Sequence, residues 1–520
     1  MLPALSGEAM READRFTIET LGIPGFTLME SAGRASAEWI QRKYGPVAGK
    51  NIACLCGKGN NGGDGFVVAR QLASMGAQMH LFLMAGEEAL SNDAVSNYHI
   101  LQALVDQDPE IIVQIHEIEH TDSFPDKFFD LLIDGLLGTG VTRSLSTRYA
   151  AAVAWINKNK APVVSLDLPS GLHANTGEIL GEVVRANLTI SMGALKSGLL
   201  LGEGPVCAGE IEVVEIGIPA IAVSKAATAY NCAHVVTHEA VKSWLPNRKH
   251  DAHKYGVGMS LVVAGSPGLS GAATLAATAA ARSGAGAVIC ATHTNVQPVL
   301  AAKMTEIMSL ALPASANGID TTAATSVLKK PLNKASSLLI GCGMGDQPDT
   351  QQFIRSLVEL SNVPTVIDAD GLNAFIGHTA LFAKHTNNNL ILTPHIGEFK
   401  RLAGDSVDLS DKISIARRYA VQWRCVLILK GAPTIVADKT GNVYINPTVN
   451  PALATAGSGD VLAGLCAGFL AQGLSPIKAA LAALFLGGTA ADRYTAHHHP
   501  ATMLASDIID QFKHVMQAYI

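Results

Sequence analysis

The chain has no basic block, few aromatic residues and no pattern typical of secretion or membrane insertion. Its net charge is −6, so it offers no electrostatic footprint for nucleic acid. Residues 1–15 lack both a basic region and a long apolar core, which argues against a signal peptide. The longest charge-free run, 255–281, is interrupted by glycine, proline and serine, which favours strand, loop and helix over a membrane span. We therefore expect a cytoplasmic protein without nucleic-acid or membrane partners.

Cysteine is sparse and poorly placed for metal binding or redox chemistry. The eight cysteines are scattered, and the only close pair, Cys54 and Cys56, has the spacing of neither a zinc knuckle nor a CxxC motif. Nothing basic beside this pair in sequence favours a thiolate. We interpret all eight as reduced thiols, mostly buried, of a cytosolic protein.

The 520 residues, of which 48% are hydrophobic, are too many for one core and favour two or three domains. Short apolar runs alternate with Ala-rich helical patterns, as in parallel sheets covered on both faces. The expected strands of the first half are 51–56, 78–82, 111–115, 131–134, 162–166, 188–191 and 211–215. The expected strands of the second half are 259–264, 286–291, 337–340, 365–368, 390–393 and 426–430. The fold class is α/β, with domains at 1–222 and 240–520 and a linker at 223–239.

Three polar loops directly follow strands of the first half, where open α/β sheets bind ligands. They are GKGNNGGDG (57–65), DGLLGTG (134–140) and DLPSG (167–171). Glycine lets backbone N–H groups approach a phosphate, but Asp64, Asp134 and Asp167 would repel one. A hard cation held by Asn61, Asp134 and Ser170 oxygens, or a carboxylate that transfers protons, resolves this conflict. The alternative is that these residues form ordinary helix caps.

These loops, together with LMESAG (28–33), resemble the YjeF N-terminal family of NAD(P)H-hydrate epimerases over about residues 1–220. The resemblance implies a Rossmann-like αβα sandwich and potassium ligands at Asn61, Asp134 and Ser170. The residues it implies for the substrate, NADHX or NADPHX, are Asn60, Asn61, Gly62, Gly63, Asp64, Gly138, Thr139, Gly140, Val141, Thr142, Arg143, Ser144 and Asp167.

The reaction that this resemblance implies interconverts the R and S hydrates at C6 of the reduced nicotinamide. Asp167 would move the proton and stabilise developing positive charge. Departure of the hydroxyl and opening of the ring are both compatible with the sequence. In a different class of function, the first half would be a non-catalytic dinucleotide-binding or interaction module.

The second half contains ATAGSGDVLAG (454–464), where glycines and a serine open an apolar helix with Asp460 in its first turn. Free N–H groups there suit a transferring phosphate, and Asp460 is placed to act as a base. Alternatively, Ser458 and Asp460 simply cap the helix. KGAPT (430–434) offers a cation and a hydroxyl after another strand. We expect His395 to be a hydrogen-bonded turn residue and Glu398 to lie in a first helical turn.

These segments resemble the ribokinase-like YjeF C-terminal family, the ADP- or ATP-dependent NAD(P)H-hydrate dehydratases, over about residues 240–515. The resemblance implies that the C6 hydroxyl is phosphorylated, with Asp460 as base, and that phosphate then leaves. It places Ala272, Gly345, His395 and Asp460 on the hydrated dinucleotide. It places Lys430, Gly431, Ala432, Pro433, Thr434 and Gly459 on the nucleotide, which we expect to be ADP with Mg²⁺.

Two segments depart from the second family. Phe485 and Leu486 precede Gly487, where a histidine is expected before the glycine. The segment 446–451 lacks the Gly-rich run that is expected before the GSGD loop. A vitamin or sugar kinase would also use the GSGD and KGAPT segments, but it leaves the first half unexplained. The tract His497-His498-His499 cannot present all three rings to one ion, so we interpret it as a solvated loop. We also expect a homo-oligomer.

Overall fold

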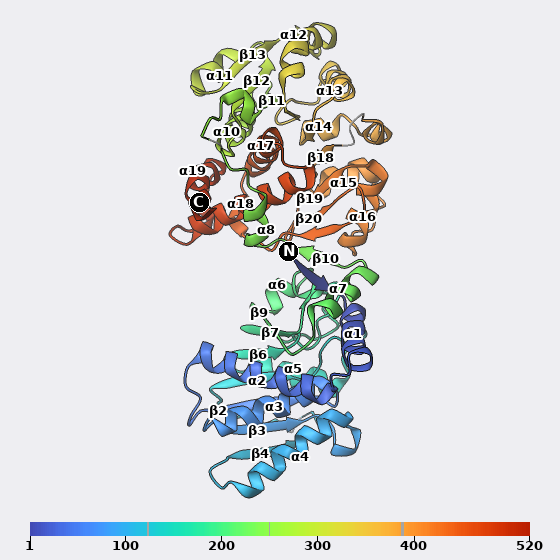
Figure 1. Cartoon of the computed structure of the whole chain (residues 1–520), viewed down its shortest axis with the longest axis vertical. Helices are drawn as coiled ribbons and strands as arrows, with labels where there is room; N and C mark the ends of the chain where they lie inside the picture. The colour runs from blue at the N-terminus through green and yellow to red at the C-terminus, as the bar shows by residue number, and fades with distance from the viewer. Residues whose placement is uncertain (122–123, 249, 386–388, 520) are drawn as a thin grey trace. The chain divides into compact units, whose positions relative to one another are not determined.

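The computed structural model describes residues 1–121, 124–248, 250–385 and 389–519. The chain divides into two compact units, Leu2–Ala233 and His234–Ile520, the second of which also includes Met1. Both contain mainly parallel strands connected by helices, as the alternating sequence pattern predicts (Figure 1). Each predicted strand occurs, displaced by no more than two residues at either end.

The first unit has a seven-stranded sheet in the order β4-β3-β2-β5-β6-β7-β9, in which every pairing is parallel. Its strands are β2 (Asn51–Cys56), β3 (Gln78–Leu83), β4 (Val113–Glu117), β5 (Leu131–Gly135), β6 (Val163–Leu166), β7 (Leu188–Met192) and β9 (Glu210–Val214). Within this sheet, β2 comes first in the chain, β3 and β4 are added on one side of it, and β5 then pairs with its other side. This reversal makes β2 and β5 the switch point of a doubly wound sheet, the usual place for a ligand.

Helices cover both faces of this sheet (Figure 1). They are α2 (Gly25–Tyr44), α3 (Asn60–Ser74), α4 (Asn92–Gln107), α5 (Thr147–Lys158) and the short α6 (Gly204–Cys207). The side chains of β2 alternate between the two resulting cores. Ile52, Cys54 and Cys56 pack with α2 and α3, whereas Ala53 and Leu55 pack with α5. Burial on both faces explains why β2 reads as a continuous apolar run.

A smaller layer is formed by the N-terminal residues and the end of the first unit. Strand β1 (Leu2–Leu5) pairs in parallel with the two-residue strand β8 (Leu195–Lys196). Helix α1 (Gly7–Arg15) packs against α7 (Ala220–Ala229) through alanines of both helices. The segment 223–239 was predicted to be a linker. In the structure it contains most of α7, the strand β10 (Ala233–Val235) and the start of α8. Its alanines have high helix propensity and little side-chain entropy to lose, which explains the helix.

The sheet of the second unit runs in the order β13-β12-β11-β16-β17-β18-β19-β20-β21-β10. Its parallel part comprises β11 (Met259–Val263), β12 (Ala287–His293), β13 (Met308–Leu312), β16 (Ser337–Ile340), β17 (Thr365–Ile367), β18 (Leu390–Leu392) and β19 (Val426–Leu429). An antiparallel hairpin, β20 (Ile435–Ala437) and β21 (Val443–Ile445), extends it, and β10 pairs in parallel with β21. A separate small hairpin consists of β14 (Ala314–Ser315) and β15 (Gly318–Ile319).

Small side chains allow the helices to approach this second sheet closely. One large core joins it to α8 (His238–Trp244), α10 (Ser270–Arg282), α11 (Gln297–Lys303), α17 (Ser458–Ala471), α18 (Pro476–Thr495) and α19 (Ala505–Met516). The other helices are α9 (Lys254–Val257), α12 (Thr321–Lys334), α13 (Pro348–Leu360), α14 (Asp370–Asn373), α15 (Ile396–Ala403) and α16 (Lys412–Trp423). A β-carbon on Gly464 of α17 would lie 2.2 Å from the carbonyl oxygen of Ala276 of α10, so this contact requires glycine. Among the described helices, none has the length and apolarity needed to cross a membrane.

Candidate active sites

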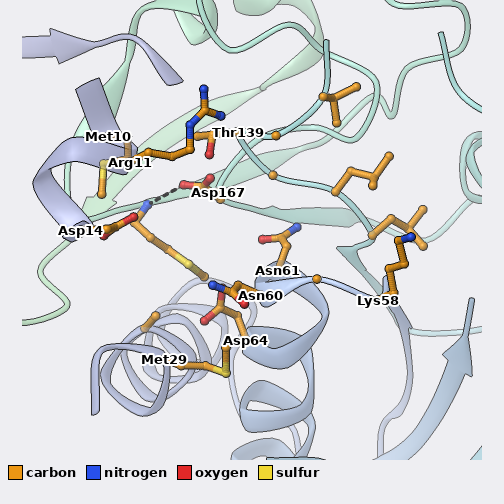
Figure 2. Close-up of a pocket in the computed structure, with 18 of the residues that line it drawn as sticks. Met10, Arg11, Asp14, Met29, Lys58, Asn60, Asn61, Asp64, Thr139 and Asp167 are labelled. Carbon is orange, nitrogen blue, oxygen red and sulfur yellow. Dashed lines mark hydrogen bonds between the residues drawn. The ribbon is translucent and has the colours of Figure 1, made fainter. Parts of the chain in front are cut away.

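A cleft of about 1110 Å³ opens at the carboxyl ends of β2, β5 and β6 in the first unit (Figure 2). All three polar loops that the sequence singles out contribute to its wall. The predicted residues that line it are Asn60, Asn61, Asp64, Gly138, Thr139, Gly140, Val141, Thr142, Arg143, Ser144 and Asp167. Gly62 and Gly63 are buried behind this wall, against Gly57 and against Met29 and Ala94 respectively.

The glycine-rich loop leaves the start of α3 open towards the cleft. Gly59 is the N-cap residue, and no side chain accepts a hydrogen bond from the first N–H groups of the helix. Tight packing explains the glycines, because a β-carbon on Gly57 would lie 1.8 Å from the carbonyl oxygen of Leu136. A β-carbon on Gly62 would lie equally close to the carbonyl oxygen of Gly57. Gly59 is itself a usual N-cap residue, so the alternative of an ordinary strand-to-helix turn stays open, and the N–H groups without a side-chain acceptor among the described residues also suit an anionic ligand.

Asp134 lies beneath the cleft, fully buried and held by four hydrogen bonds. Its Oδ1 accepts from Ser170 Oγ at 2.6 Å and from the N–H of Leu136 at 3.2 Å. Its Oδ2 accepts from Ser165 Oγ at 2.8 Å and from the N–H of Ser170 at 2.9 Å. Burial raises the pKa of Asp134 from its usual value, whereas these bonds lower it. The predicted contact between Asp134 and Ser170 is therefore present.

The side-chain amide of Asn61 is buried in this region without a partner among the described residues. It is 8% exposed, and neither its Oδ1 nor its Nδ2 has a hydrogen-bond partner among the described residues. A β-carbon on Gly138 would lie 3.6 Å from Cγ of Asn61, so the amide faces the second loop. A buried amide without partners costs free energy unless a ligand or ion satisfies it.

Asp167 follows β6 in a strained conformation, with φ of 67°. Its Oδ1 accepts a hydrogen bond from the ammonium group of Lys196, which is almost fully buried. The same ammonium group also donates to the carbonyl oxygen of Met192 at 2.6 Å and to Ser191 Oγ at 3.4 Å. The other oxygen, Oδ2, faces Gly138 and the cleft. One oxygen of Asp167 is thus fixed by the protein and the other faces the space for a ligand.

The cleft also contains Asp14, Arg11 and Lys196, which the sequence analysis missed. Lys196 could have been noticed in the sequence as a lone cation after an apolar run, but the sequence does not indicate which residue it contacts. Asp14 belongs to no motif and reaches the cleft through α1. Burial and the nearby Asp167 and Asp14 carboxylates raise the pKa of Asp64 well above its usual value.

The second unit has a comparable helix start at Ser458. The N-cap residue of α17, Gly457, is left-handed with φ of 90°, and no side chain caps the helix. Ser458 Oγ donates instead to the carbonyl oxygens of Leu453, at 2.9 Å, and Thr455, at 3.0 Å. Capping by Ser458 and Asp460, the alternative considered from the sequence, is therefore wrong. The N–H groups at the start of α17 lack side-chain acceptors.

Lys430 connects this helix start to a buried carboxylate. Its Nζ donates to Asp368 Oδ1 at 3.0 Å and lies 4.0 Å from Glu398 Oε2. Thr393 Oγ1 also donates to Asp368 Oδ1, at 2.6 Å. Burial lowers the pKa of Lys430, but Asp368 and Glu398 outweigh it and the net shift is upward. A β-carbon on Gly459 would lie 3.3 Å from Lys430 Nζ, so the two predicted nucleotide segments lie together.

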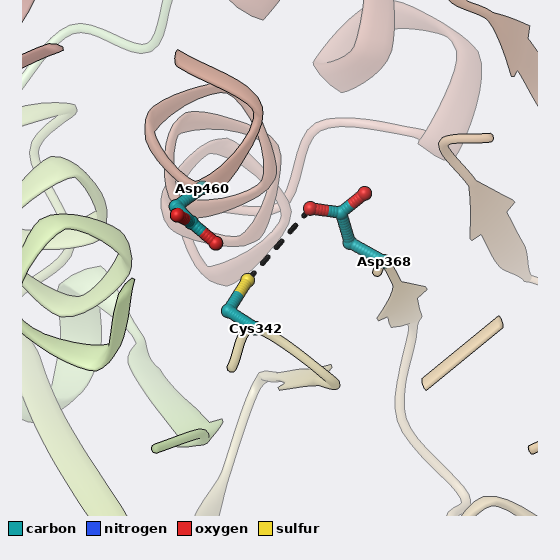
Figure 3. A group of neighbouring side chains, drawn as sticks. All are labelled: Cys342, Asp368 and Asp460. Carbon is teal, nitrogen blue, oxygen red and sulfur yellow. Dashed lines mark hydrogen bonds between the residues drawn. The ribbon is translucent and has the colours of Figure 1, made fainter. Parts of the chain in front are cut away.

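Asp460 faces Cys342 and Asp368, which follow β16 and β17 (Figure 3). Burial and the Asp368 carboxylate raise the pKa of Asp460 to about 6, against smaller opposing effects of Cys342 and Lys430. Burial, with the two carboxylates, raises the pKa of the Cys342 thiol well above its usual value. The thiol therefore stays protonated, and its Sγ lies 3.8 Å from Asp368 Oδ2. Roles for Cys342 and Asp368 could not be predicted from the sequence, because their proximity to Asp460 depends on the order of the strands.

The remaining predicted residues of the second unit lie at the same carboxyl edge. His395 forms a capping box with Glu398, as its Nδ1 accepts from the N–H groups of Gly397 and Glu398. The prediction that His395 is a hydrogen-bonded turn residue is confirmed. The N–H of Gly345 donates to Asp370 Oδ2 at 2.8 Å, and Ala272 packs beside Gly343. The three histidines 497–499 are exposed.

Each centre thus places acids and open helix N-termini at the carboxyl edge of a parallel sheet, which defines an α/β enzyme with two sites. A family model described as YjeF-related protein N-terminus matches residues 25–198, and one described as NAD(P)H-hydrate dehydratase matches residues 260–514. A bifunctional NAD(P)H-hydrate repair enzyme of Salinibacter ruber is 46% identical over 519 residues, 99% of this chain and 96% of that protein. One of Moorella thermoacetica is 40% identical over 511 residues, 98% of this chain and 95% of that protein.

A solved structure of the ADP/ATP-dependent NAD(P)H-hydrate dehydratase from Bacillus subtilis, co-crystallised with ATP/Mg²⁺, is also similar. It is 31% identical, covers 55% of this chain and 99% of that chain, and has a TM-score of 0.47. The chain belongs to the family of bifunctional NAD(P)H-hydrate repair enzymes.

Proposed function

We propose that the first unit interconverts the R and S hydrates of NADH and NADPH, and that the second unit dehydrates the S form at the expense of ADP. The observation that supports the first activity best is the convergence of three strand-end loops on one cleft, with Asp167 facing it. The observation that supports the second is the uncapped start of α17, where Asp460 meets Lys430 and Asp368.

In the first unit, the N–H groups at the start of α3 and the loop 138–144 bind the pyrophosphate and ribose groups of the dinucleotide. Arg143 in this loop offers a cation to the phosphates. Asp167 Oδ2 then faces the hydrated nicotinamide, where it moves a proton and stabilises positive charge at C6. The ion pair with Lys196 fixes the orientation of this carboxylate.

Asn61, Asp134 and Ser170 would hold a potassium ion at the base of this cleft. The unpartnered amide of Asn61 fits such an ion, because its oxygen is buried and accepts no hydrogen bond from the described residues. Asp134 supplies negative charge, although its four hydrogen bonds already occupy most of its acceptor positions. The ion would neutralise the acidic base of the cleft and orient the loops that contact the dinucleotide.

In the second unit, Asp460 removes the proton of the C6 hydroxyl as that oxygen attacks the terminal phosphate of the nucleotide. The N–H groups at the start of α17 stabilise the transferring phosphate, and Lys430 to Thr434 with Gly459 bind the rest of the nucleotide. Ala272, Gly345 and His395 contact the dinucleotide. The ring nitrogen then expels phosphate, and loss of a C5 proton restores the double bond of NADH or NADPH.

A magnesium ion bound with the nucleotide would neutralise charge on its phosphates. Cys342, Asp368 and Asp460 form a compact cluster, but they do not suit a resident magnesium ion. A protonated thiol is a poor ligand for a hard cation, and the Lys430 ammonium group already lies 3.0 Å from Asp368. All eight cysteines are free, which suits an enzyme of the reducing cytoplasm.

The experiment that tests this proposal supplies the purified protein with a mixture of S and R hydrates of NADH, with Mg²⁺ and K⁺. ADP and ATP are added in separate reactions, and recovery of NADH absorbance is recorded. Complete recovery with ADP supports both activities and identifies the phosphate donor. Failure of both nucleotides to restore any NADH contradicts the dehydratase assignment and points to a kinase for a different substrate.

A further inference from the structure

A third acid, Asp14, reaches the cleft of the first unit from outside the three loops. Residue pairing places it there, because Leu5 of β1 lies beside Lys196 of β8 and α1 follows β1 directly. The alanine face of α1, including Ala13, packs on α7. Asp14 and Arg11, three residues apart, lie on the side of α1 that lines the cleft. Figure 2 shows the carboxyl groups of Asp14, Asp64 and Asp167 around the same space.

The Asp14 carboxyl group has no structural task within the residues that the structure describes. It accepts no hydrogen bond and forms no ion pair there, although other charged residues of α1 have partners. Glu12 pairs with Arg15, and Glu8 accepts from Asn175 Nδ2 at 2.9 Å. The nearest cation, Lys196, donates instead to Asp167, Met192 and Ser191. A half-buried carboxyl group without a partner, on the wall of a ligand cleft, is available for chemistry.

Burial, together with the charged groups around Asp14, keeps its two protonation states close in free energy. Burial raises the pKa of Asp14 to about 6, with Lys196 lowering it and Asp167 raising it. Across the cleft, the Asp14 carboxylate contributes to the raised pKa of Asp64. On α7, which packs against α1, the charged residue is Lys225, whose ammonium group lies over the ring of Phe16. Near neutral pH a proton can therefore leave or return at Asp14 without a large cost.

We propose that Asp14 is the second acid–base residue of the epimerase centre and acts with Asp167 on opposite faces of the hydrated nicotinamide ring. This inference rests on the proposed epimerase function. Asp14 donates its proton to the C6 hydroxyl, the C–O bond breaks, and both its electrons leave on a water molecule. The lone pair of the ring nitrogen forms a C=N bond to C6. A second water molecule adds to the opposite face, loses its proton to Asp167 and returns the lone pair to nitrogen.

After each inversion Asp14 has lost a proton and Asp167 has gained one, so solvent carries a proton from Asp167 back to Asp14 before the next turnover. The reverse reaction follows the same steps with the two carboxyl groups exchanging roles, so one site serves both hydrates. No oxidant or reductant is needed, because one water leaves and one water is added. The scheme selects hydroxyl departure over ring opening. It also gives Arg11, beside Asp14, no direct part in the chemistry.

The test uses the full-length protein without ADP or ATP, so that dehydration cannot occur and epimerisation is observed alone. Purified R hydrate is converted to S hydrate by wild type, Asp14→Asn, Asp14→Glu and the control Glu12→Gln, and chromatography follows the two forms. Glu12 lies on the same helix but does not line the cleft. We expect Asp14→Asn to lower kcat about 100-fold with KM changed less than threefold, and Glu12→Gln to match wild type. Asp14→Glu should recover at least tenfold over Asp14→Asn.

Two further readouts separate a chemical role from a structural one. Wild-type kcat should fall as pH rises above about 6, where Asp14 loses its proton, and Asp14→Asn should lack this dependence. In H₂¹⁸O, each inversion by wild type should introduce one ¹⁸O at C6. The role of Asp14 is overturned if wild type is active and the kcat of Asp14→Asn lies within threefold of the wild-type value. It is also overturned if Asp14→Asn changes only KM, or if inversion introduces no ¹⁸O. Absence of epimerisation by wild type overturns the proposed function itself.

Discussion

Lys430 donates a hydrogen bond to Asp368 over 3.0 Å, and a β-carbon on Gly459 would lie 3.3 Å from the same ammonium nitrogen. The KGAPT loop and the start of α17 therefore meet at the amino group of one lysine. They come from opposite sides of the β20–β21 hairpin in the sequence. This contact allows the nucleotide-binding role of both segments to be tested by adding a single methyl group.

Replacement of Gly459 by alanine should displace Lys430 and weaken nucleotide binding. We expect the KM for ADP to rise about tenfold, which corresponds to about 1.4 kcal/mol, with a smaller change in kcat. The measurement is the initial rate of NADH formation from S hydrate at varied ADP. Gly487→Ala is the control, because its β-carbon would meet only Leu465 at 3.6 Å within a helix. An unchanged KM in Gly459→Ala would contradict the placement of the nucleotide.

Replacement of Asp460 by asparagine should lower the kcat of dehydration by about 10²- to 10⁴-fold. The active form of a base is the deprotonated form, and the pKa of Asp460 is about 6. Wild-type kcat should therefore rise with pH up to about 6 and level off above it. Initial rates measured between pH 5 and 8 test this, with Asp438→Asn in an exposed turn as control. A rate that falls over this range as pH rises would assign Asp460 the opposite role.

The raised pKa of Asp460 predicts that its carboxylate lowers the stability of the second unit above about pH 6. Because the pKa of Asp460 rises from 3.8 to about 6 on folding, the folded chain binds the proton more tightly, and stability declines as pH rises through this interval. Asp460→Asn should thus raise the free energy of unfolding of the second unit at pH 8 by roughly 1–3 kcal/mol. Below about pH 4 the variant and wild type should be equal. Urea unfolding at the two pH values measures both differences, and a variant less stable at pH 8 argues against the shift.

The buried amide of Asn61 should respond to substitution in two opposite ways. Asn61→Leu removes two unpartnered polar atoms and should raise the melting temperature of the first unit in potassium-free buffer. It should also abolish the response of epimerisation to added KCl. Asn97→Leu is the control, since Asn97 is buried in the same unit and also has an unpartnered oxygen. Potassium activation that persists in Asn61→Leu would remove Asn61 from the ion site.

Two glycines of one loop should differ sharply in their tolerance of alanine. A β-carbon on Gly62 would lie 1.8 Å from the carbonyl oxygen of Gly57, whereas one on Gly59 would have no neighbour within 4 Å. We expect Gly62→Ala to lower the melting temperature of the first unit by several degrees and Gly59→Ala to leave it within about one degree. Differential scanning calorimetry compares them. Equal melting temperatures would mean that the loop relaxes at little cost.

The strands and the loops at their ends could be predicted from the sequence because both depend on local patterns. Buried parallel strands such as β2 are continuous apolar runs, and loops such as 57–65 carry their glycines in a fixed order. The side chains that fix the acids could not be predicted. Asp14 reaches the cleft through the pairing of β1 with β8, in which Leu5 lies beside Lys196, 191 residues further along the chain. Lys196 meets Asp167 because β6 pairs with β7, and no local sequence pattern reveals that contact. The hairpin β20–β21 was missed because no helix separates its two short strands, whereas the equally short β17 and β18 fit the alternation of strands with helices.

Two separate centres in one chain should repair both hydrates, and a mixing experiment with two variants tests this division of labour. Asp167→Ala and Asp460→Asn are each given mixed S and R hydrates with ADP, Mg²⁺ and K⁺, alone and then together. We expect Asp167→Ala to restore NADH quickly only from the S fraction and Asp460→Asn to restore almost none. Equimolar Asp167→Ala and Asp460→Asn together should restore all of it, at a rate near that of wild type. Rapid, complete recovery by Asp167→Ala alone would contradict the account, as would failure of the two variants to complement each other.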